Sequence, residues 1–413
     1  MKSTQLRRLT VLLVSGALAV AATGCASAKA TDASPDKVVD APGVSADTIT
    51  LGIIADLTGP FASTGVPTVE GAQLFWADHK VCERSVELVV KDTAYKTDRA
   101  KAAYSEMHND VLAIQASTAT PITVVNMEDF ATDNMMVIAV PSPALAGNDN
   151  ILLAGTLNDV EMMNAVSFAV SDLGIASGDT VGAIYLNNDF GKGSLAGVQK
   201  AADAAGLKVV AQPAEVTDKD MTAQITALAG AGVKAVFVAG SAGVLNSAVT
   251  IAKAQGLDVP FVSSAGAFDA SALKTSAESG LVSNTYLVAY VAPFSDKAEG
   301  PTTARKAFEK AGTDITPSHW LNLGYGMASI MDKTLSEACA KDDLSREGLL
   351  KAVAQLDEFD TEGAMIPLAF SRNSPGVASF VLRPDAAATG GLAVFAKPFV
   401  GNLTSKIVGL PAK

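Results

Sequence analysis

From Asp47 onward, short runs rich in β-branched residues alternate with segments that carry apolar residues at helical spacing. This alternation predicts βαβ units, which build a mostly parallel sheet covered by helices. The strands expected in the first half are 48–55, 85–92, 111–116, 134–140 and 150–155, with helices at 66–79, 98–109 and 121–133. The alternation then starts afresh, so we expect an α/β fold of two doubly wound parallel-sheet lobes.

The second set of elements is expected to begin with a helix at 159–173. Strands are expected at 180–186, 207–212, 234–240 and 260–266, and helices at 191–205, 220–230 and 243–255. The rest of the chain predicts an extended stretch at 281–294, helices at 301–311, 318–339 and 345–356, and antiparallel strands within 365–385 and 392–400. A chain of 413 residues is too long for one ordinary core, which also favours two lobes.

The first 24 residues have the order of charge and hydrophobicity that is typical of a secretory signal peptide. Lys2, Arg7 and Arg8 precede an apolar run at 11–22, which is shorter than the about 20 residues that a membrane-spanning helix needs. Ala22-Thr23-Gly24 before Cys25 is similar to a bacterial lipobox, so we expect cleavage there and a lipid anchor on Cys25. The alternatives are an ordinary cleaved signal with an incidental cysteine and an uncleaved membrane helix.

Residues 25–46 are rich in Ala, Ser, Asp and Pro and carry no apolar period, which predicts a flexible tether. Removal of the leader, with its three basic and no acidic residues, takes the formal charge from −12 to −15. Such a negative surface does not favour nucleic acid or anionic lipid as a partner.

The cysteine and histidine content bears on redox state and metal binding. Outside the cytoplasm, Cys82 and Cys339 are expected to pair as a disulfide, with two independent buried thiols as the alternative. The three histidines, His79, His108 and His319, stand in no CxxC, HExxH or His-Cys arrangement. We therefore expect neither a zinc site nor a metal cofactor.

Loops rich in glycine and small hydroxyl or amide residues follow the expected strands. They are ADLTGPFASTG (55–65), QASTATP (115–121), VPSPALAG (140–147), LNNDFGKG (186–193), GSAG (240–243) and SSAGAFD (263–269). In open parallel sheets, ligands bind beyond the carboxyl ends of the strands, and helix N-termini there offer N–H groups to anions. Helix capping explains many of these residues equally well, but six such loops predict a shared polar cleft between the lobes.

Two motifs suggest enzymes but fit poorly. GKGSLAG at 191–197 is similar to a dinucleotide-binding turn, yet 187–190 separates it from its strand and the next strand ends without an acid. The alternative is that Asp189 caps a helix whose glycines allow close packing. AGSAG around Ser241 departs from GxSxG, and no histidine with an acid can be assigned to it. We therefore expect a chain that is not an enzyme and needs no cofactor.

Several stretches together resemble the Leu/Ile/Val-binding type of periplasmic solute-binding protein, fold type I. These are ITLGIIADLTGPFASTGVPTVEGAQLFW (49–76), YLNNDFGKGSLAGVQKAADAAGLKVV (185–210), DKDMTAQITALAGAGVKAVFVAG (218–240), AKAQGLDVPFVSSAG (252–266), YGMASIMDKTLSEAC (325–339) and FDTEGAMIPLAF (359–370). The resemblance implies two lobes joined by three hinge crossings, which close over a solute destined for an ABC-type membrane permease. It places 47–156 with 288–361 in one lobe and 157–287 with 362–413 in the other. Cys82 and Cys339 then share a lobe, which favours their bridge.

The resemblance also implies which residues contact the solute. They are Thr64, Ser117, Thr118, Ser142, Asp189, Phe190, Ser241 and Ala265. Relatives that bind α-amino acids hold the ammonium with a Thr and an acid, where this chain has Ala144, near Ser142, and Ala265. An ammonium buried without a carboxylate costs several kcal/mol, so these replacements argue against an α-amino-acid ligand. Thr64 stands where many relatives have an aromatic residue.

The resemblance therefore predicts a lipid-anchored extracytoplasmic bacterial protein that captures a small organic solute of the amino acid or related carboxylate or amide class. A ligand sensor that acts with a membrane signalling partner is the first alternative. An enzyme with a nucleotide cofactor is the second.

Overall fold

The computed structural model describes residues 41–356, 358–369 and 376–410. The predicted signal peptide, Cys25 and most of the predicted tether lie outside these residues. The end of that tether, 41–46, is joined to the folded chain: Val44 forms a β-bridge with Ile49, and the Thr50 N–H donates to the Gly43 carbonyl at 2.7 Å.

A six-stranded sheet forms the core of the first lobe. Its order is β2 (Lys80–Val81), β3 (Arg84–Asp92), β1 (Thr48–Ala55), β4 (Ala113–Ser117), β5 (Val137–Ala139) and β6 (Ile151–Leu153), and it is parallel except for the β2–β3 hairpin. Strand order reverses at β1, because β3 pairs on one side of it and β4 on the other. Ligands in doubly wound folds bind beyond the carboxyl ends of the strands at such a reversal.

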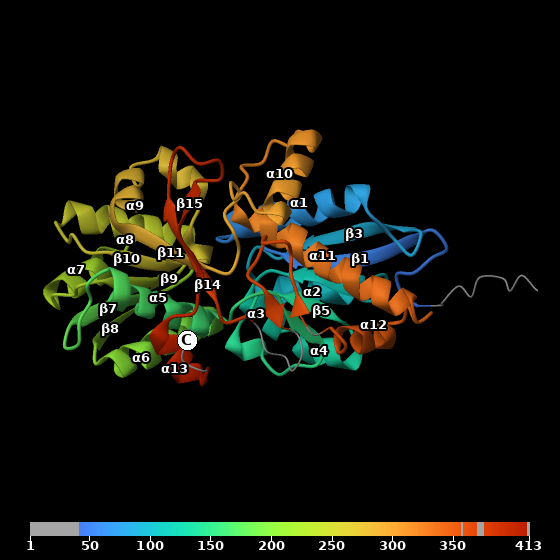
Figure 1. The fold of residues 1–413 in the computed structure, drawn as a ribbon, viewed down its shortest axis with the longest axis horizontal. Helices are drawn as coiled ribbons and strands as arrows, with labels where there is room; N and C mark the ends of the chain where they lie inside the picture. Colours follow the sequence, from blue (N-terminus) through green and yellow to red (C-terminus); the bar gives the residue numbers. More distant parts are fainter. Residues whose placement is uncertain (1–40, 357, 370–375, 411–413) are drawn as a thin grey trace, which may run out of the picture. The chain divides into compact units, whose positions relative to one another are not determined.

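The second sheet has seven strands. Its order is β15 (Leu392–Phe399), β14 (Ser379–Pro384), β11 (Thr285–Ala289), β10 (Phe261–Ser264), β9 (Val236–Ala239), β7 (Thr180–Leu186) and β8 (Lys208–Ala214). The first five strands in chain order are parallel, and β14 and β15 add antiparallel to β11. The expected α/β fold with two parallel-dominated sheets is therefore confirmed (Figure 1).

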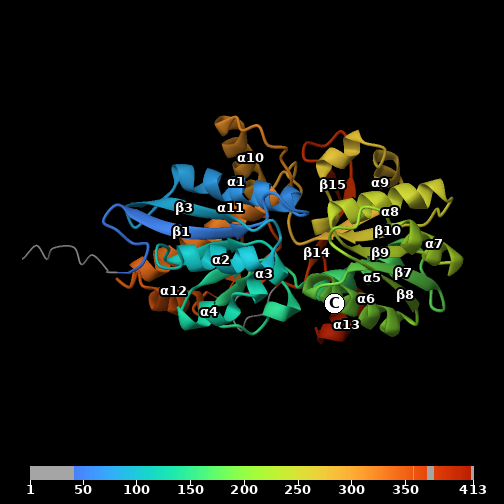
Figure 2. The same cartoon turned by 180° about the vertical axis from the view of Figure 1, so that it is seen from behind.

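Helices cover both sheets (Figures 1 and 2). Those grouped with the first sheet are α1 (Ala62–Asp78), α2 (Thr97–Met107), α3 (Thr120–Val124), α4 (Met127–Thr132), α10 (Glu299–Ala311), α11 (His319–Cys339) and α12 (Arg346–Val353). Those grouped with the second are α5 (Asn158–Asp172), α6 (Asp189–Ala205), α7 (Thr222–Gly230), α8 (Ala242–Ala254), α9 (Glu278–Asn284) and α13 (Asn402–Val408). In the described part of the chain, none of the helices combines the length and apolar character that crossing a bilayer requires.

Three connections run between the two groups of elements. Thr156 bridges Gly376, Val291 bridges Met365, and the Ile366 N–H donates to the Tyr290 carbonyl at 2.9 Å. Asn322 on α11 donates its side-chain amide to the carbonyls of Ala292 and Pro293 at 3.0 and 3.2 Å. The connecting segments are therefore hydrogen-bonded to one another and to α11.

Cys82 and Cys339 form a disulfide, with Cα atoms 6.2 Å apart. Cys82 and Glu83 make the two-residue turn between β2 and β3, and both have positive φ, 53° and 65°. Such values are typical of the tight turns that suit the twist of a hairpin. The disulfide thus ties this hairpin to the last residue of α11.

The structure differs from the predicted elements in several places. The single helix expected at 121–133 is two helices, because the buried Asn126 at the break donates its side-chain amide to the carbonyls of Ala100 and Ile122. Residues 281–284, expected to be extended, end α9. The terminal helix α13 and the strand β12 (Glu358–Phe359) were not predicted. Strand β13 (Leu368–Ala369), which pairs antiparallel with β12, lies within 365–385, where antiparallel strands were expected.

Candidate functional site

A pocket lies where the carboxyl ends of the first sheet's strands face elements of the second. The cavity has a volume of about 70 Å³, counted as the space that the centres of water molecules can reach. The first lobe lines it with residues after β1, β3, β4 and β5 and at the start of α11: Phe61, Thr64, Tyr95, Thr118, Ala119, Thr120, Val140, Pro141 and Trp320. The second lobe lines it with Asn158, Glu161, Phe190, Ser264, Ala265 and Gly266, and the connections add Thr156 and Tyr290.

Asp56 shapes the loop that follows β1. Its carboxylate accepts the N–H groups of Gly59 at 2.6 Å and Phe61 at 2.8 Å, and it is buried. Gly65 packs so closely on this turn that a Cβ there would lie 2.0 Å from the Asp56 carbonyl oxygen. These contacts fix the start of α1 and thereby the positions of Phe61 and Thr64.

Tyr95 reaches the second lobe from the loop after β3. Ala94 and Tyr95 both have positive φ, 46° and 59°, and Asp92 holds the turn by accepting the Ala94 N–H at 2.9 Å. The Tyr95 hydroxyl accepts the side-chain amide of Asn188 at 3.1 Å. The Oδ1 atom of Asn188 in turn caps α6 by accepting the Gly191 N–H at 3.0 Å. A backbone of unusual conformation therefore supports a hydrogen bond between the lobes.

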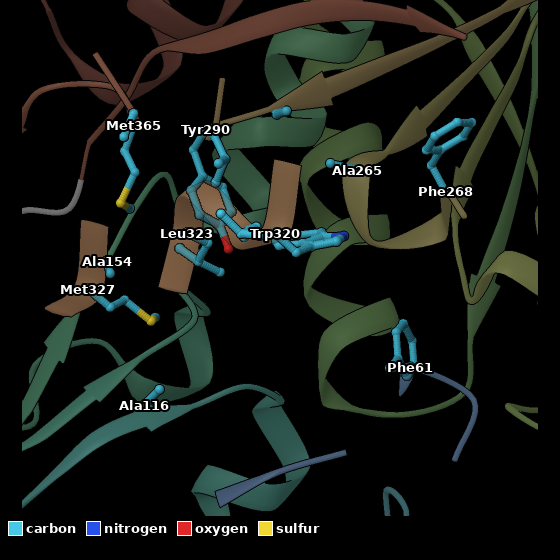
Figure 3. Close-up of a cluster of buried hydrophobic side chains, with 14 of the residues drawn as sticks. Phe61, Ala116, Ala154, Ala265, Phe268, Tyr290, Trp320, Leu323, Met327 and Met365 are labelled. Atoms are coloured by element: carbon cyan, nitrogen blue, oxygen red, sulfur yellow. The ribbon is translucent and has the colours of Figure 1, made fainter. Parts of the chain in front are cut away.

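Aromatic rings form much of the pocket wall. The Phe61 ring lies 4.8 Å from Tyr95 and 6.4 Å, edge to face, from Phe190, counted between centroids. Tyr290 and Trp320 are 6.4 Å apart, and Figure 3 shows them side by side with the indole extending toward Ala265. Phe61 and Phe190 come from different lobes, so the wall closes across the cleft.

Buried polar atoms face this apolar wall. Within the described residues, no hydrogen-bond partner exists for Thr64 Oγ1, Ser264 Oγ, Trp320 Nε1, Asn158 Oδ1 and Glu161 Oε1. Burial raises the pKa of Glu161 well above its usual range. Burial, followed by the charge of Glu161, raises the pKa of Tyr290. Buried polar atoms are normally hydrogen-bonded, so a ligand with polar atoms would find partners here.

Comparisons with known proteins agree with this geometry. The family model described as "Periplasmic binding protein" matches residues 48–381. The chain belongs to the periplasmic binding protein family. Among curated proteins, no sequence matches.

Solved structures of this family resemble the chain along most of its length. A fatty acid ABC transporter substrate-binding protein from Thermomonospora curvata is 33% identical, with a TM-score of 0.87, and the match covers 90% of this chain and 97% of that one. A branched-chain amino acid ABC transporter from Thermus thermophilus with bound valine is 18% identical, with a TM-score of 0.77 and coverage of 87% and 98%. A leucine-binding protein from Thermotoga maritima is 16% identical, with a TM-score of 0.73 and coverage of 84% and 97%.

Half of the predicted contact residues line the pocket of this periplasmic binding protein. Thr64, Thr118, Phe190 and Ala265 do so. Ser117 does not, because its hydroxyl is hydrogen-bonded to the Thr123 hydroxyl at 2.7 Å. The remaining three also lie off the lining: Ser142 accepts the Ala144 N–H at the start of a short 3-10 helix, Asp189 is exposed, and Ser241 is the N-cap residue of α8.

The glycines of 191–197 let α6 pack closely on the end of β7 and on α5. They lie inside α6, where a Cβ on Gly191 would be 2.0 Å from the Leu186 carbonyl oxygen and one on Gly197 would be 2.0 Å from that of Asp159. This agrees with the packing alternative to a dinucleotide turn. The cap of α6, however, is Asn188 and not Asp189 as predicted, because Asn188 Oδ1 accepts the Gly191 N–H.

Sequence reasoning named four of the lining residues and missed the other thirteen. Six of the missed residues lie outside the strand-end loops that were singled out, namely Tyr95, Thr156, Asn158, Glu161, Tyr290 and Trp320. A usable signal existed for Phe61, which stands in a strand-end loop that was singled out. Glu161 is the one acid in the mostly apolar stretch 160–169, whose residues are all buried in the structure, and this isolated acid was a second usable signal. Within 41–356, 358–369 and 376–410, His, Cys, Asp and Glu side chains form no group of three or more that could hold a metal ion.

Proposed function

We propose that this periplasmic binding protein is the substrate-binding component of an ABC-type importer and captures a small organic solute between its lobes. The observation that carries the proposal is the pocket, whose lining comes from both lobes at the carboxyl ends of their strands. Its structural relatives include a fatty acid ABC transporter substrate-binding protein and a branched-chain amino acid ABC transporter, which supports the same role.

The proposed solute has an apolar body and a few polar atoms, within the amino acid or related carboxylate or amide class. Aromatic side chains from both lobes suit the apolar body. In the described lining there is no lysine, arginine or histidine, so hydroxyl, amide, indole or backbone groups would bind the polar end. Thr64, Thr118, Phe190 and Ala265 are the proposed contacts that the sequence predicted.

The proposed mechanism is hinge closure about the three connecting segments. A ligand that contacts both lobes binds the closed form better than the open form, and this difference shifts the population toward closure. The hydrogen bond from Asn188 to Tyr95 and the contact of Phe61 with Phe190 join the two lobes. They would be made on closure and lost on opening.

We also propose that the protein is extracytoplasmic and held at the membrane by a lipid on Cys25, next to its permease. The leader and the lipobox-like residues before Cys25 support this anchoring. Mass spectrometry of the protein from a bacterial membrane fraction would test it: a diacylglyceryl group on an N-terminal Cys25 is expected, and an unmodified cysteine would contradict it.

A thermal-shift screen tests the binding function. The panel contains branched-chain amino acids, short-chain carboxylates, aromatic acids, amides and polyols. A ligand at hundredfold excess over its Kd stabilises the folded state by about 2.7 kcal/mol, so a clear rise in Tm is expected for at least one class. The pocket-filling variant Ala265→Trp should lose the shift, and Glu128→Gln on the exposed surface should keep it. Silence of the whole panel, or an equal shift in Ala265→Trp, would contradict the proposal.

A further inference from the structure

Glu161 is an acid with no partner in the wall of the pocket. It stands in the first turn of α5 and is 4% exposed, and its Oε1 has no hydrogen-bond partner among the described residues. Its neighbour Asp159 differs, because Lys200 lies 3.7 Å from the Asp159 carboxylate. One oxygen of Asp159 therefore has a lysine nearby, although Asp159 Oδ1 has no hydrogen-bond partner among the described residues, while Glu161 lines the pocket with no lysine beside it in the described lining.

Among the described residues that line the pocket, none carries a charge opposite to that of an ionised Glu161. The described lining of the pocket contains no basic side chain, and Tyr290 is the titratable group there whose pKa responds to Glu161. The other charged groups on α5 and on the helices packed against it are Asp159 and Asp172 on α5, Asp189, Lys192, Lys200 and Asp203 on α6, and Lys406 on α13. Burial, and none of these charges, raises the pKa of Glu161. Burial favours the neutral form of such a carboxyl, which carries one O–H donor.

The other unpartnered atoms of the pocket are mostly donors. Trp320 Nε1 can only donate, and the hydroxyls of Thr64 and Ser264 can donate. The Tyr95 hydroxyl accepts a hydrogen bond from Asn188, which leaves its own hydrogen available. Asn158 Oδ1 is the opposing acceptor. Because these groups line one small cavity, a molecule bound there would meet several donors at once.

We propose that Glu161 selects ligands that end in a carboxylate, to which it donates the proton of its own neutral carboxyl group. The hydroxyl and indole donors of the same pocket would take the remaining lone pairs of the ligand. This inference rests on the proposed function and adds to it the class of ligand and the residue that chooses it.

The same arrangement rejects an ammonium. Pairing with a cation would require Glu161 to ionise in a buried site, and the gain from a buried ion pair often does no more than offset that cost. Trp320 Nε1 and the hydroxyl donors would then have no acceptor, and each unmade buried hydrogen bond costs free energy. A carboxylate satisfies these groups together, and an alcohol of equal size satisfies fewer of them.

The test uses three ligands of equal length, namely pentanoate, pentylamine and 1-pentanol, with calorimetric titration of the purified full chain. Pentanoate is expected to bind at least about tenfold more tightly than pentylamine, the factor for one charge-assisted hydrogen bond. Glu161→Gln keeps an N–H donor and should keep pentanoate affinity within about threefold, while Glu161→Leu should weaken it about tenfold or more. Asp159→Asn changes an acid two residues before Glu161 in the same helix turn and is the matched control. This variant should bind pentanoate as tightly as the unchanged chain does.

Three results would overturn the inference. Tighter binding of pentylamine, lost in Glu161→Gln, would make Glu161 the counter-charge of a cation. Equal pentanoate affinity in Glu161→Leu would show that Glu161 plays no part in selection. Absence of binding by all three ligands would also contradict the inference about Glu161. If another class of ligand still raised the Tm in the thermal-shift screen, the proposed function would remain supported. If no ligand bound in the calorimetric titration and none raised the Tm, both the inference and the proposed function would be contradicted.

Discussion

At the scale of single residues, the protein keeps a neutral histidine in its interior. His319, the first residue of α11, is fully buried, and neither ring nitrogen has a hydrogen-bond partner in the described part of the chain. Its ring packs against Trp320 of the pocket wall at 4.4 Å between centroids. Burial lowers the pKa of His319 to about 3, so the folded state holds the ring neutral where an unfolded chain would protonate it.

This burial predicts a dependence of stability on pH. Below the unfolded pKa of about 6.5, the unfolded state binds a proton that the folded state does not. The free energy of unfolding therefore decreases as the pH is lowered, on the order of 1 kcal/mol for each pH unit, until about pH 3. His319→Leu should remove this contribution. Urea unfolding of both proteins between pH 4 and 7 measures it, with exposed His79→Gln as the control. A difference between wild type and His319→Leu that stays constant over this range would contradict the prediction.

At the scale of elements, close packing of α1 on α11 holds in place the side of the pocket that the first lobe lines. A Cβ on Gly324 would lie 1.9 Å from the Thr68 carbonyl oxygen, and one on Gly71 would lie 2.1 Å from that of Leu321. Each helix therefore offers a glycine to the backbone of the other. Since α11 carries Trp320 and α1 carries Thr64, this contact also sets the distance between two parts of the lining.

Gly324→Ala is expected to lower the free energy of unfolding by about 1 to 3 kcal/mol, because the added methyl group forces the two backbones apart. Gly230→Ala at the end of α7 is the matched control, since a Cβ there meets open space. It should be neutral or stabilise by up to about 1 kcal/mol through helix propensity. Thermal and urea unfolding measure both variants, and an equal effect of the two changes would argue against the close contact.

The hydrogen bond between the lobes has its own test. Tyr95→Phe keeps the ring against Phe61 but removes the hydroxyl that accepts from Asn188. The closed form should lose about 1 kcal/mol, which weakens ligand binding by roughly fivefold. Tyr286→Phe in the second sheet, away from the pocket lining, controls for loss of a hydroxyl. Unchanged Kd in Tyr95→Phe, measured by calorimetry, would show that this hydrogen bond does not contribute to closure.

Periodicity predicted the regular elements well because burial decides them. The strand expected at 48–55 is β1, and the helix expected at 318–339 is α11 with a shift of one residue at its start. The break at Asn126 could not be read from the chain, because it depends on a contact of that side chain with Ala100, which lies far away in sequence.

Prediction of the site was limited for a related reason. Five of the six strand-end loops contribute residues to the pocket lining, but successive residues of an extended chain point to opposite sides. Thr118 therefore lines the pocket while Ser117 turns to Thr123. Glu161, Tyr290 and Trp320 lie in a helix turn, a connection and another helix, and no local pattern brings such separate segments together.

At the scale of the whole molecule, two doubly wound lobes, the connections between them and the pocket are the parts by which we propose that the protein closes on its solute. The pocket wall and the Tyr95–Asn188 hydrogen bond both need the lobes to meet. The free protein should therefore sample a more open form, and ligand should shift the population to the closed one.

The most direct measurement is a distance between the lobes during titration. Fluorophores on Glu128→Cys in α4 and Asp203→Cys in α6, both at exposed positions, report it by energy transfer in a chain whose Cys25 is changed to Ser. Pentanoate and the other members of the panel are added in turn. For each ligand that raises the Tm, the distance between the fluorophores should become shorter and its distribution narrower, and this change should be half complete at a ligand concentration equal to the Kd. A distribution that no such ligand alters, at concentrations that saturate the thermal shift, would contradict capture of the solute by closure between the lobes.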